Sequence, residues 1–321
     1  MNKYVGHKSQ LYGIEECRLV GGKGDGMRIL NVNNGKGLMF SVSVDRAGDI
    51  SRMYYKGTNL VFIAPCGYVG PEYYDDKGGG FLKSMTAGLL TTCGLTSVGP
   101  ACIDEGETLP VHGTISNIPA ESVNYWEEDG KLCIKLIVRD ARLFGRKLLL
   151  TRLYDCSLTE NEVKIVDTVE NIDFKESPYM ILYHMNFGYP LVSENAIVTF
   201  DYKDFRPRDA EAAKGVDTPL VMEKPQIGYK EQCFYYKMNT GFAKIFNPDL
   251  GFGVSVNYNV DELPELTEWK LMNAGEYVLG IEPGNVNPDG RAVVREQGKL
   301  KFLQPGEKAT QTLVVKIENE Q

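Results

Sequence analysis

Three residues of the chain could together move protons: His112, His184 and Glu282. His184 lies in the apolar run Tyr179–Pro190, which reads as a strand, two positions before Asn186. Side chains two apart on a strand share a face, so the imidazole and the amide are expected to project together from its end. Histidine titrates near neutral pH and a partly desolvated glutamate can accept a proton, so the pattern predicts general acid–base chemistry.

The settings of His112 and Glu282 favour the same interpretation. His112 directly precedes Gly113, and glycine is common where the backbone must come close to a ligand. Glu282 follows the apolar run Val278–Ile281, where an acid must reach solvent or be paired. Each residue alone could equally be structural, for example as a core histidine bonded to a carbonyl. Two of the chain's three histidines fall in this set, which favours a functional site.

The segments that must position these residues read as short β-strands. Between residues 125 and 172 the runs LCIKLIVRD, KLLLTRLYDCSL and EVKIVDTVENI are separated by turn signals such as EEDG and TENE. Spacing this regular predicts a sandwich or barrel rather than β–α–β units. Phe205–Gly215 is the one segment that reads as a short helix, and the tail reads as a hairpin around Gln304–Gly306. We predict one domain, residues 1–321, that is almost all β.

Two further segments could present polar side chains to a ligand. The alternating strand Leu38–Val44 is followed by a glycine-containing turn that carries Arg46 and Asp49. This turn could face a ligand or could be a solvated hairpin corner. Lys83 is the one charge in the small and apolar stretch Phe81–Leu95, where it could contact a ligand or face solvent.

The composition argues against several classes of partner and cofactor. Lys and Arg number 35 against 43 acidic residues, and the net charge of −8 disfavours a nucleic-acid backbone or an anionic membrane as the main partner. The seven cysteines form no CxxC pair and no zinc-like cluster, which is typical of a reducing compartment. The start of the chain lacks the apolar core of a signal peptide, and no window is apolar enough to span a membrane. We therefore expect a cytoplasmic protein without a metal site.

The order of the motifs resembles a known family. His-Gly at 112–113, His-x-Asn at 184–186 and a late strand with Glu282 look like the aldose 1-epimerase (mutarotase) superfamily. More closely, FLKSMTAGLLTTCGL, HGTISNIPAE, YHMNFGYPL and EWKLMNAGEYVLGIEPGN resemble the DUF4432 group of aldose 1-epimerase-like proteins, over Leu38 to Pro305. The resemblance implies an all-β fold, the large antiparallel β-sandwich of galactose mutarotase-like proteins.

The resemblance also implies an activity and a role for each residue. The protein would interconvert the α and β anomers of a sugar by opening and closing its ring. His184 would protonate the ring oxygen, Glu282 would take the proton of the anomeric hydroxyl, and His112 would hold and polarise the sugar. One donor and one acceptor exchange roles on the return step, so no metal or redox cofactor is expected.

The chain departs from the better-known galactose mutarotases where those proteins bind the sugar. Their arginine upstream of the first histidine has no clear match, and Lys83 stands near that place. Trp269, on a late strand where a sugar contact is expected, could stack on a sugar face or belong to the core. Further candidate contacts are Arg46, Asp49, Asn117, Asn186 and Lys270. Convergence of Arg46, Lys83 and Lys270 would favour an acidic or phosphorylated sugar; otherwise a neutral sugar is expected.

Two other functions stay open on the same residues. An acid and a base beside an open-chain sugar could remove a proton next to the carbonyl, which gives isomerisation or epimerisation at carbon 2. A sandwich of this type could also bind a carbohydrate without turnover, because a fold does not fix a function. In each case the expected partner is a small-molecule sugar or sugar derivative, and the sequence allows a homodimer.

Overall fold

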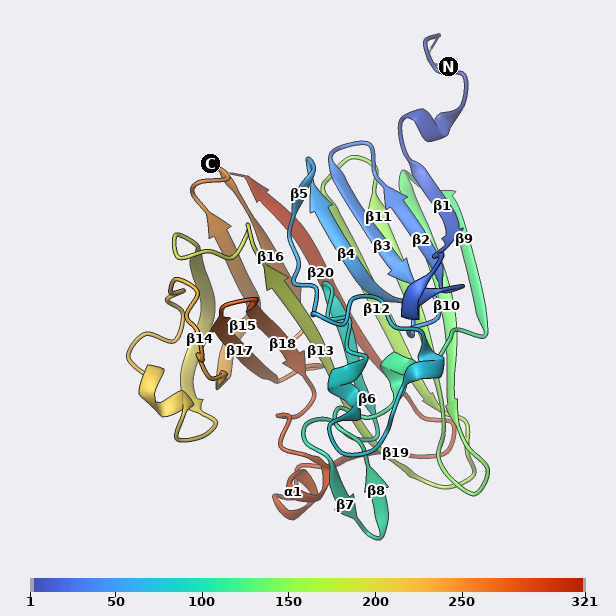
Figure 1. Cartoon of the computed structure of the whole chain (residues 1–321). Coiled ribbons are helices and arrows are strands. Elements are labelled where there is room, and N and C mark those ends of the chain that lie inside the picture. Colours follow the sequence, from blue (N-terminus) through green and yellow to red (C-terminus); the bar gives the residue numbers. More distant parts are fainter. Residues whose placement is uncertain (1–2, 320–321) are drawn as a thin grey trace.

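The computed structural model describes residues 3–319, and its regular structure is almost all antiparallel strand (Figure 1). A first sheet has its five strands in sequence order: β1 (Gly13–Arg18), β2 (Arg28–Asn33), β3 (Leu38–Ser43), β4 (Asp49–Tyr55) and β5 (Thr58–Asn59). An Asn-Gly turn joins β2 to β3, and Gly35 adopts the positive φ of 70° that a tight hairpin turn requires.

The second sheet is larger, with 13 strands. Its hydrogen-bonded order is β19 (Lys301–Leu303), β13 (Ser177–Gly188), β18 (Glu276–Gly284), β17 (Glu265–Asn273), β15 (Gln232–Asn247), β16 (Phe252–Tyr258), β20 (Lys308–Asn319), β12 (Glu162–Asn171), β11 (Lys147–Ser157), β10 (Lys131–Ala141) and β9 (Ser122–Glu128). In addition, β6 (Leu90–Leu95) pairs with β13, and β14 (Ile197–Pro207) pairs with β15. A separate hairpin consists of β7 (Cys102–Asp104) and β8 (Glu107–Leu109).

The five-stranded sheet packs on the part of the large sheet that contains β10 to β12 (Figure 1). Burial alternates along β11, so every second side chain faces the other sheet. The hydroxyl of Tyr154 on β11 donates to the carbonyl oxygen of Gly48, just before β4, at 2.7 Å. One apolar cluster contains Leu30 and Phe40 from the first sheet and Leu150 from the second. The predicted large antiparallel β-sandwich is confirmed, and the single domain stays a prediction.

The other half of the large sheet is covered on both faces. Every residue of β13 except Pro178 is buried, which is why this strand reads as an unbroken apolar run. Loops from the first third of the chain cover it: Val61 bridges to Phe187, and Gly94 of β6 bridges to Gly113. These loops, together with β13, β18, β17 and β15, enclose the candidate site.

The helix prediction for Phe205–Gly215 is wrong. The strand β14 continues to Pro207 in its ladder with β15, and only Ala212–Gly215 forms a 3₁₀ helix. Proline is tolerated there because β14 is an edge strand, whose one strand partner within residues 3–319 is β15. Within residues 3–319 the one α-helix is α1 (Arg291–Glu296), which the sequence pattern does not predict. The remaining helices are short 3₁₀ turns at Lys8–Gln10, Gly22–Gly24, Pro71–Tyr73, Gly80–Lys83 and Ile115–Asn117.

The tail is also paired differently from the hairpin predicted around Gln304–Gly306. A turn does form there, and the N–H of Glu307 donates to the carbonyl oxygen of Gln304 at 2.9 Å. The strands on its two sides nevertheless have different neighbours, because β19 pairs with β13 whereas β20 lies between β12 and β16. The turn therefore reverses the chain without joining two paired strands.

Candidate active site

The register of β13, β18 and β17 brings the predicted acid and base together. Met185 pairs with Ile281 in an antiparallel ladder, so His184 lies opposite Glu282. On the other side of β18, Glu282 pairs with Thr267. The three side chains therefore occupy neighbouring positions on one face of the sheet.

His184 and Glu282 line a cavity of about 510 Å³. The Nε2 atom of His184 lies 3.2 Å from Oε1 of Glu282, within ion-pair range. This Oε1 atom and Nδ1 of His184 are nevertheless buried without an aligned hydrogen bond. The residues are 5% and 2% exposed, so they lie away from bulk water. A buried pair that is left incompletely bonded beside open volume is an arrangement that a ligand can complete.

His112 joins this pair from the loop between β8 and β9. Its ring centroid lies 5.6 Å from that of His184, edge to face at 79°. Gly113 approaches β6 so closely that an added Cβ would lie 2.1 Å from the carbonyl oxygen of Gly94. The glycine thus permits a close backbone approach, to a strand rather than to a ligand. The N–H of Gly99 donates to Nδ1 of His112 at 3.4 Å, which leaves the proton of the neutral ring on Nε2.

Burial controls the protonation of these three groups. It lowers the pKa of His184 to about 3 and that of His112 to about 4, because a buried imidazolium loses its hydration. Burial raises the pKa of Glu282 well above its usual value; Glu231 adds to this rise and Arg208 opposes it. Burial thus favours the uncharged form of each of the three groups.

Several polar or reactive residues line the cavity without having been predicted from the sequence: Arg208, Glu231, Cys233, Thr267 and Asp289. The guanidinium of Arg208 donates to the carboxylates of Asp209 and Glu231, each at 2.9 Å. It also donates to Sγ of Cys233 at 3.0 Å. Arg208 lies just after Pro207 in the segment that was predicted to be helical, which obscured the direction of its side chain.

The sequence carries a signal for Thr267 through its spacing from Trp269, whereas Cys233 joins them only through the strand register. Thr267 precedes Trp269 by two positions, and Cys233 pairs with Trp269 across β15 and β17, so all three share a face. The Oγ1 atom of Thr267 is buried without a hydrogen-bond partner. Asp289 gives no such signal, because it lies in the loop before α1; it accepts a hydrogen bond from the hydroxyl of Tyr235 at 2.7 Å.

Among the predicted contact residues, all within the described part of the chain, Trp269 alone lines this cavity. Its ring lies 5.2 Å from that of His184, edge to face at 77°. Its Nε1–H donates to Glu231 at 2.8 Å. Gly280 lies opposite it on β18, where an added Cβ would be 2.9 Å from the Cβ of Trp269 and 2.7 Å from Oε1 of Glu282. The indole therefore needs a glycine at this place to reach the cavity.

The two asparagines predicted as contacts bond to the protein instead. Asn186 donates to the carbonyl oxygen of His184 at 2.8 Å and to that of Gly88 at 3.2 Å. It holds the backbone that carries His184, and its side chain does not line the cavity. Asn117 is buried, donates to the hydroxyl of Ser116 at 3.3 Å, and likewise does not line it.

Arg46 and Asp49 also lie away from the cavity. Arg46 is buried, and its guanidinium donates to three backbone carbonyl oxygens. Asp49 is buried and accepts a hydrogen bond from Arg152 at 2.7 Å. Their turn is therefore neither a ligand-facing loop of this cavity nor a solvated hairpin corner. It is a buried junction between the two sheets.

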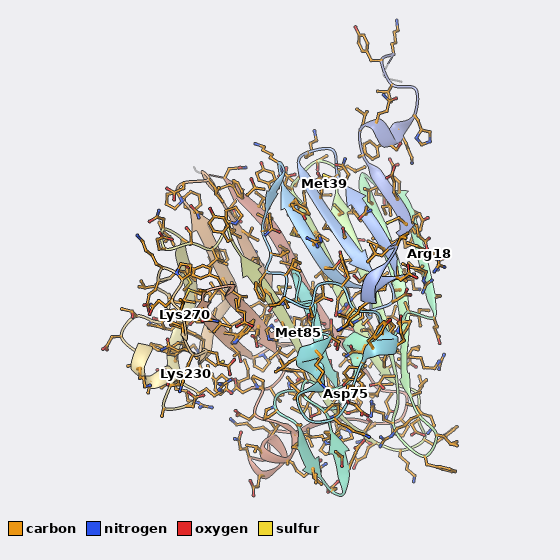
Figure 2. The ribbon with its side chains drawn as sticks, in the orientation of Figure 1. Arg18, Met39, Asp75, Met85, Lys230 and Lys270 are labelled. Atoms are coloured by element: carbon orange, nitrogen blue, oxygen red, sulfur yellow. The ribbon has the colours of Figure 1, made fainter. Side chains whose placement is uncertain are left out.

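Neither predicted lysine lines the cavity. Lys83 pairs with Asp75 at 3.1 Å, and its side chain is 69% exposed. Lys270 follows Trp269 on β17, so it points to the opposite face, where it donates to the carbonyl oxygen of Thr218 at 3.2 Å. Figure 2 places Lys270 and Asp75 in different parts of the molecule. Since Arg46, Lys83 and Lys270 do not converge, the condition for an acidic or phosphorylated sugar is not met.

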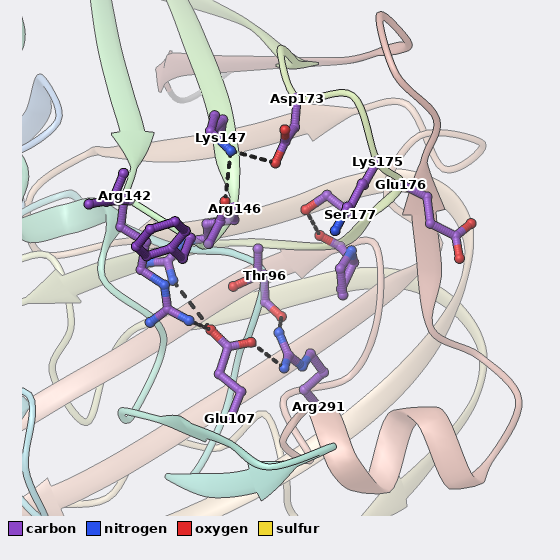
Figure 3. A pocket seen from close by; sticks show the side chains of 14 residues that line it. Thr96, Glu107, Arg142, Arg146, Lys147, Asp173, Lys175, Glu176, Ser177 and Arg291 are labelled. Atoms are coloured by element: carbon purple, nitrogen blue, oxygen red, sulfur yellow. Dashed lines mark hydrogen bonds and ion pairs between the residues drawn. The ribbon is translucent and has the colours of Figure 1, made fainter.

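A second cavity, of about 620 Å³, is lined by residues of β8, the β10–β11 turn and α1 (Figure 3). Glu107 accepts hydrogen bonds there from Arg142 and Arg291, each at 2.6 Å, and Arg146 lies 3.7 Å away. The charges of this cavity are thus largely paired with one another. None of the three histidines, all in the described residues, lines it. The smaller cavity is therefore the better candidate for proton transfer.

Residues 3–319 contain neither a cluster of metal ligands nor a membrane-spanning helix. No group of three or more His, Cys, Asp and Glu side chains there is arranged to hold a metal ion. No helix in that part of the chain is long and apolar enough to cross a membrane.

Comparison with known proteins identifies one matching family. The model of the family described as "Domain of unknown function (DUF4432)" matches residues 24–317. The match includes the cavity residues on β13, β17 and β18. No curated protein matches the chain.

Solved structures share the fold. A "putative aldose 1-epimerase" from Klebsiella pneumoniae superposes with a TM-score of 0.90 at 24% identity, over 98% of this chain and 86% of that one. A galactose 1-epimerase from Lactobacillus acidophilus gives 0.67 at 15% identity, over 97% and 100% of the two chains. A galactose mutarotase-like protein from Clostridium acetobutylicum gives 0.67 at 16% identity, over 97% and 99%. At these identities the likeness shows the fold.

Proposed function

We propose that this chain, which belongs to the DUF4432 family, is an aldose 1-epimerase-like enzyme that interconverts the α and β anomers of a sugar. The observation that carries the proposal is the 3.2 Å contact between Nε2 of His184 and Oε1 of Glu282 at the wall of a cavity. The names of structures with the same fold, which include aldose 1-epimerase and galactose 1-epimerase, support this class of reaction.

The two groups suit a reaction at two oxygens of one carbon, because the anomeric carbon carries both the ring oxygen and the anomeric hydroxyl. Glu282 takes the hydroxyl proton while His184 gives a proton to the ring oxygen. The bond between the anomeric carbon and the ring oxygen breaks, which leaves an aldehyde and a free hydroxyl. Rotation about the C1–C2 bond presents the other carbonyl face, and the reverse transfers close the ring. Each positioned proton transfer contributes roughly 10²–10⁴-fold in rate.

These roles require one proton on the pair formed by His184 and Glu282. Burial favours neutral His184 and protonated Glu282, so the pair carries one proton and no net charge. Passing this proton from Glu282 to His184 produces the carboxylate base and the imidazolium acid without changing the charge of the buried site. Sugar oxygens that bond to each of the two groups from the cavity would stabilise the charged form.

The remaining cavity residues bind the sugar. His112, neutral with its proton on Nε2, donates to a sugar oxygen and polarises it. Arg208 is the one lining cation, and it is already bonded to Glu231. Asp289 adds a further carboxylate to the wall. A phosphate or carboxylate on the substrate would meet these acids, so the charges favour a neutral sugar.

The proposal includes the domain organisation of the enzyme, its cellular location and its partners. Residues 1–321 would form one domain that acts in the cytoplasm on a small-molecule sugar, with neither nucleic acid nor membrane as a partner. The acid–base route described above needs no metal or redox cofactor, because it transfers only protons. This acid–base route is compatible with a homodimer.

Polarimetry on freshly dissolved pure anomers tests the proposal. We expect the wild-type protein to accelerate the approach to optical equilibrium for neutral aldoses, and His184→Ala to remove the acceleration. If no aldose, uronate or sugar phosphate equilibrates faster with the protein than in buffer, the proposal is overturned. Solvent deuterium at carbon 2 would assign isomerisation or 2-epimerisation instead, and sugar binding without turnover would assign a binding protein.

A further inference from the structure

We infer that the substrate is larger than one hexose: a reducing sugar with a second ring or other substituent that turns an apolar face to one wall of the cavity. This apolar wall consists of Phe81, Leu82, Met85, Pro100 and Val111. The inference rests on the proposed function, because it concerns the part of the same cavity that lies away from Glu282.

The cavity is larger than one hexose needs. A hexose has about 12 non-hydrogen atoms, which fill roughly 360 Å³ even at the ≈ 30 Å³ that one water molecule occupies in the liquid. The cavity measures about 510 Å³. The remaining volume admits further substrate atoms beside the reacting ring.

The two walls of the cavity differ in chemistry. The sheet supplies the polar wall, with His184, Glu282 and Thr267 on three adjacent strands. The apolar wall comes from the loops between β5 and β6 and between β6 and β9, and its side chains carry no strong hydrogen-bonding group. A hexose has hydroxyls around its ring, and those facing this wall would lose water without gaining a partner. An apolar face avoids that cost.

Three successive contacts between aromatic rings indicate where the apolar wall lies relative to the two histidines. Trp269 lies 5.2 Å from His184, His184 lies 5.6 Å from His112, and His112 lies 5.3 Å from Phe81, each between ring centroids. Phe81 thus lies against His112, whereas Trp269 lies against His184. The reacting ring would lie on the side of Trp269 and Thr267, and the substituent on the side of Phe81.

The apolar wall is built separately from the core of the sandwich. Phe81, Met85 and Ala87 form a small buried cluster of their own, against which Val111 packs. Beside this cluster, Leu82 lines the cavity while remaining 69% exposed. An apolar substituent that covered this leucine would remove its side chain from water and so gain binding energy.

A substrate series tests the inference with the intact chain. The probes are free hexoses, their 6-O-benzyl ethers and reducing disaccharides, and the measurement is kcat/KM for mutarotation. We expect at least one extended sugar to exceed its parent hexose by about 10-fold or more. Preference for disaccharides assigns a second ring, and preference for ethers alone assigns an apolar substituent. If hexoses are accelerated and every extended sugar is equal or slower, this inference is overturned while the proposed function stands. If no sugar is accelerated, both are overturned.

A matched pair of variants locates the contact. Leu82→Ser shortens an exposed side chain of the apolar wall, and Leu143→Ser does the same for an 82% exposed leucine at the second cavity. We expect Leu82→Ser to lower kcat/KM for the preferred extended sugar by about 3- to 10-fold, and more than for the parent hexose. Leu143→Ser should match the wild type. An effect of Leu82→Ser no larger than that of its control would overturn the assignment of the apolar wall.

Discussion

Two buried clusters of ionisable residues in this molecule are built in opposite ways. The first, between the two sheets, contains Arg152, Asp167 and Asp49, and Arg152 is fully buried. Its guanidinium donates to both oxygens of Asp167, to Asp49 and to the hydroxyl of Thr92, at 2.6–2.9 Å. All polar side-chain atoms of these three charged residues have partners in the protein.

The second cluster, His184 and Glu282, is as deeply buried but is incompletely bonded. Nδ1 of His184, Oε1 of Glu282 and Oγ1 of the neighbouring Thr267 all lack an aligned partner. All three residues line the 510 Å³ cavity. An unsatisfied buried polar group costs stability, so a site that keeps three of them is built for something that arrives from outside.

The contrast separates buried ionisable groups that hold the fold from buried ionisable groups that await a ligand. A change in the first cluster should lower the free energy of unfolding and spare the chemistry. A change in the second should abolish the chemistry and spare the fold. Loss of activity without loss of stability in the first cluster would contradict this distinction. Loss of stability without loss of activity in the second would contradict it as well.

Glu282→Gln should have the largest effect on activity. Removing the base should lower kcat for mutarotation by about 10²–10⁴-fold, because an amide cannot accept the hydroxyl proton. The free energy of unfolding in urea should stay within about 1 kcal/mol of the wild type, since the amide avoids burying a carboxyl group whose pKa is already raised. Glu121→Gln, which changes an exposed ion pair with Arg139, is the matched control and should leave both quantities unchanged. A fully active Glu282→Gln would remove this residue from the mechanism.

Arg152→Met should have the largest effect on stability. It leaves Asp167 and Asp49 buried without their cation, which typically costs about 3–5 kcal/mol. Urea unfolding measures the loss, and kcat of the folded fraction should fall far less than in Glu282→Gln. If Arg152→Met does not fold, the double variant Arg152→Met/Asp167→Leu should recover part of the stability, because it also removes one uncompensated carboxylate. Equal stability of Arg152→Met and the wild type would contradict the structural role of this cluster.

The same contrast explains what the sequence could and could not predict. The β content and the positions of His112, His184 and Glu282 followed from strand patterns, motif order and family resemblance. The sequence leaves the role of Arg46 and Asp49 open, because a charge in a glycine-containing turn looks alike whether it faces a ligand or bonds to carbonyl oxygens. Only the packing of the two sheets distinguishes these cases.

The direction in which a side chain points was harder to predict than the strand that carries it. Period-2 alternation says that Trp269 and Lys270 point to opposite faces of β17, but not which face borders the cavity. Arg208 and Asp289 enter the cavity from loops, where no periodicity applies. Their placement depends on contacts with residues distant in the sequence, such as the bond of Asp289 to Tyr235.

His112→Gln should give a smaller effect, seen as a change in the pH dependence of stability. Burial lowers the pKa of His112 to about 4 in the folded protein, against 6.5 for an unperturbed histidine. Between these values the unfolded chain binds a proton that the folded protein does not, so stability falls as pH falls from 7 to 5. On this basis the wild type should lose on the order of 1–2 kcal/mol more than His112→Gln over that interval. Equal losses in urea titrations at the two pH values would mean that His112 is not kept neutral by burial.

Thr267→Val should have the smallest effect on kcat/KM. It tests most directly whether the unsatisfied polar groups beside the cavity bind the substrate. Valine keeps the shape of threonine but cannot bond to a sugar hydroxyl, so kcat/KM should fall by about 3- to 10-fold, the value of one neutral hydrogen bond. Stability should stay equal or rise, because Oγ1 of Thr267 has no partner in the protein to lose. Thr267→Ser keeps the hydroxyl and should retain most of the activity. If Val lowers stability and leaves kcat/KM intact, this hydroxyl belongs with the bonded charges of the core, and an unsatisfied group beside the cavity is not by itself a sign of a ligand.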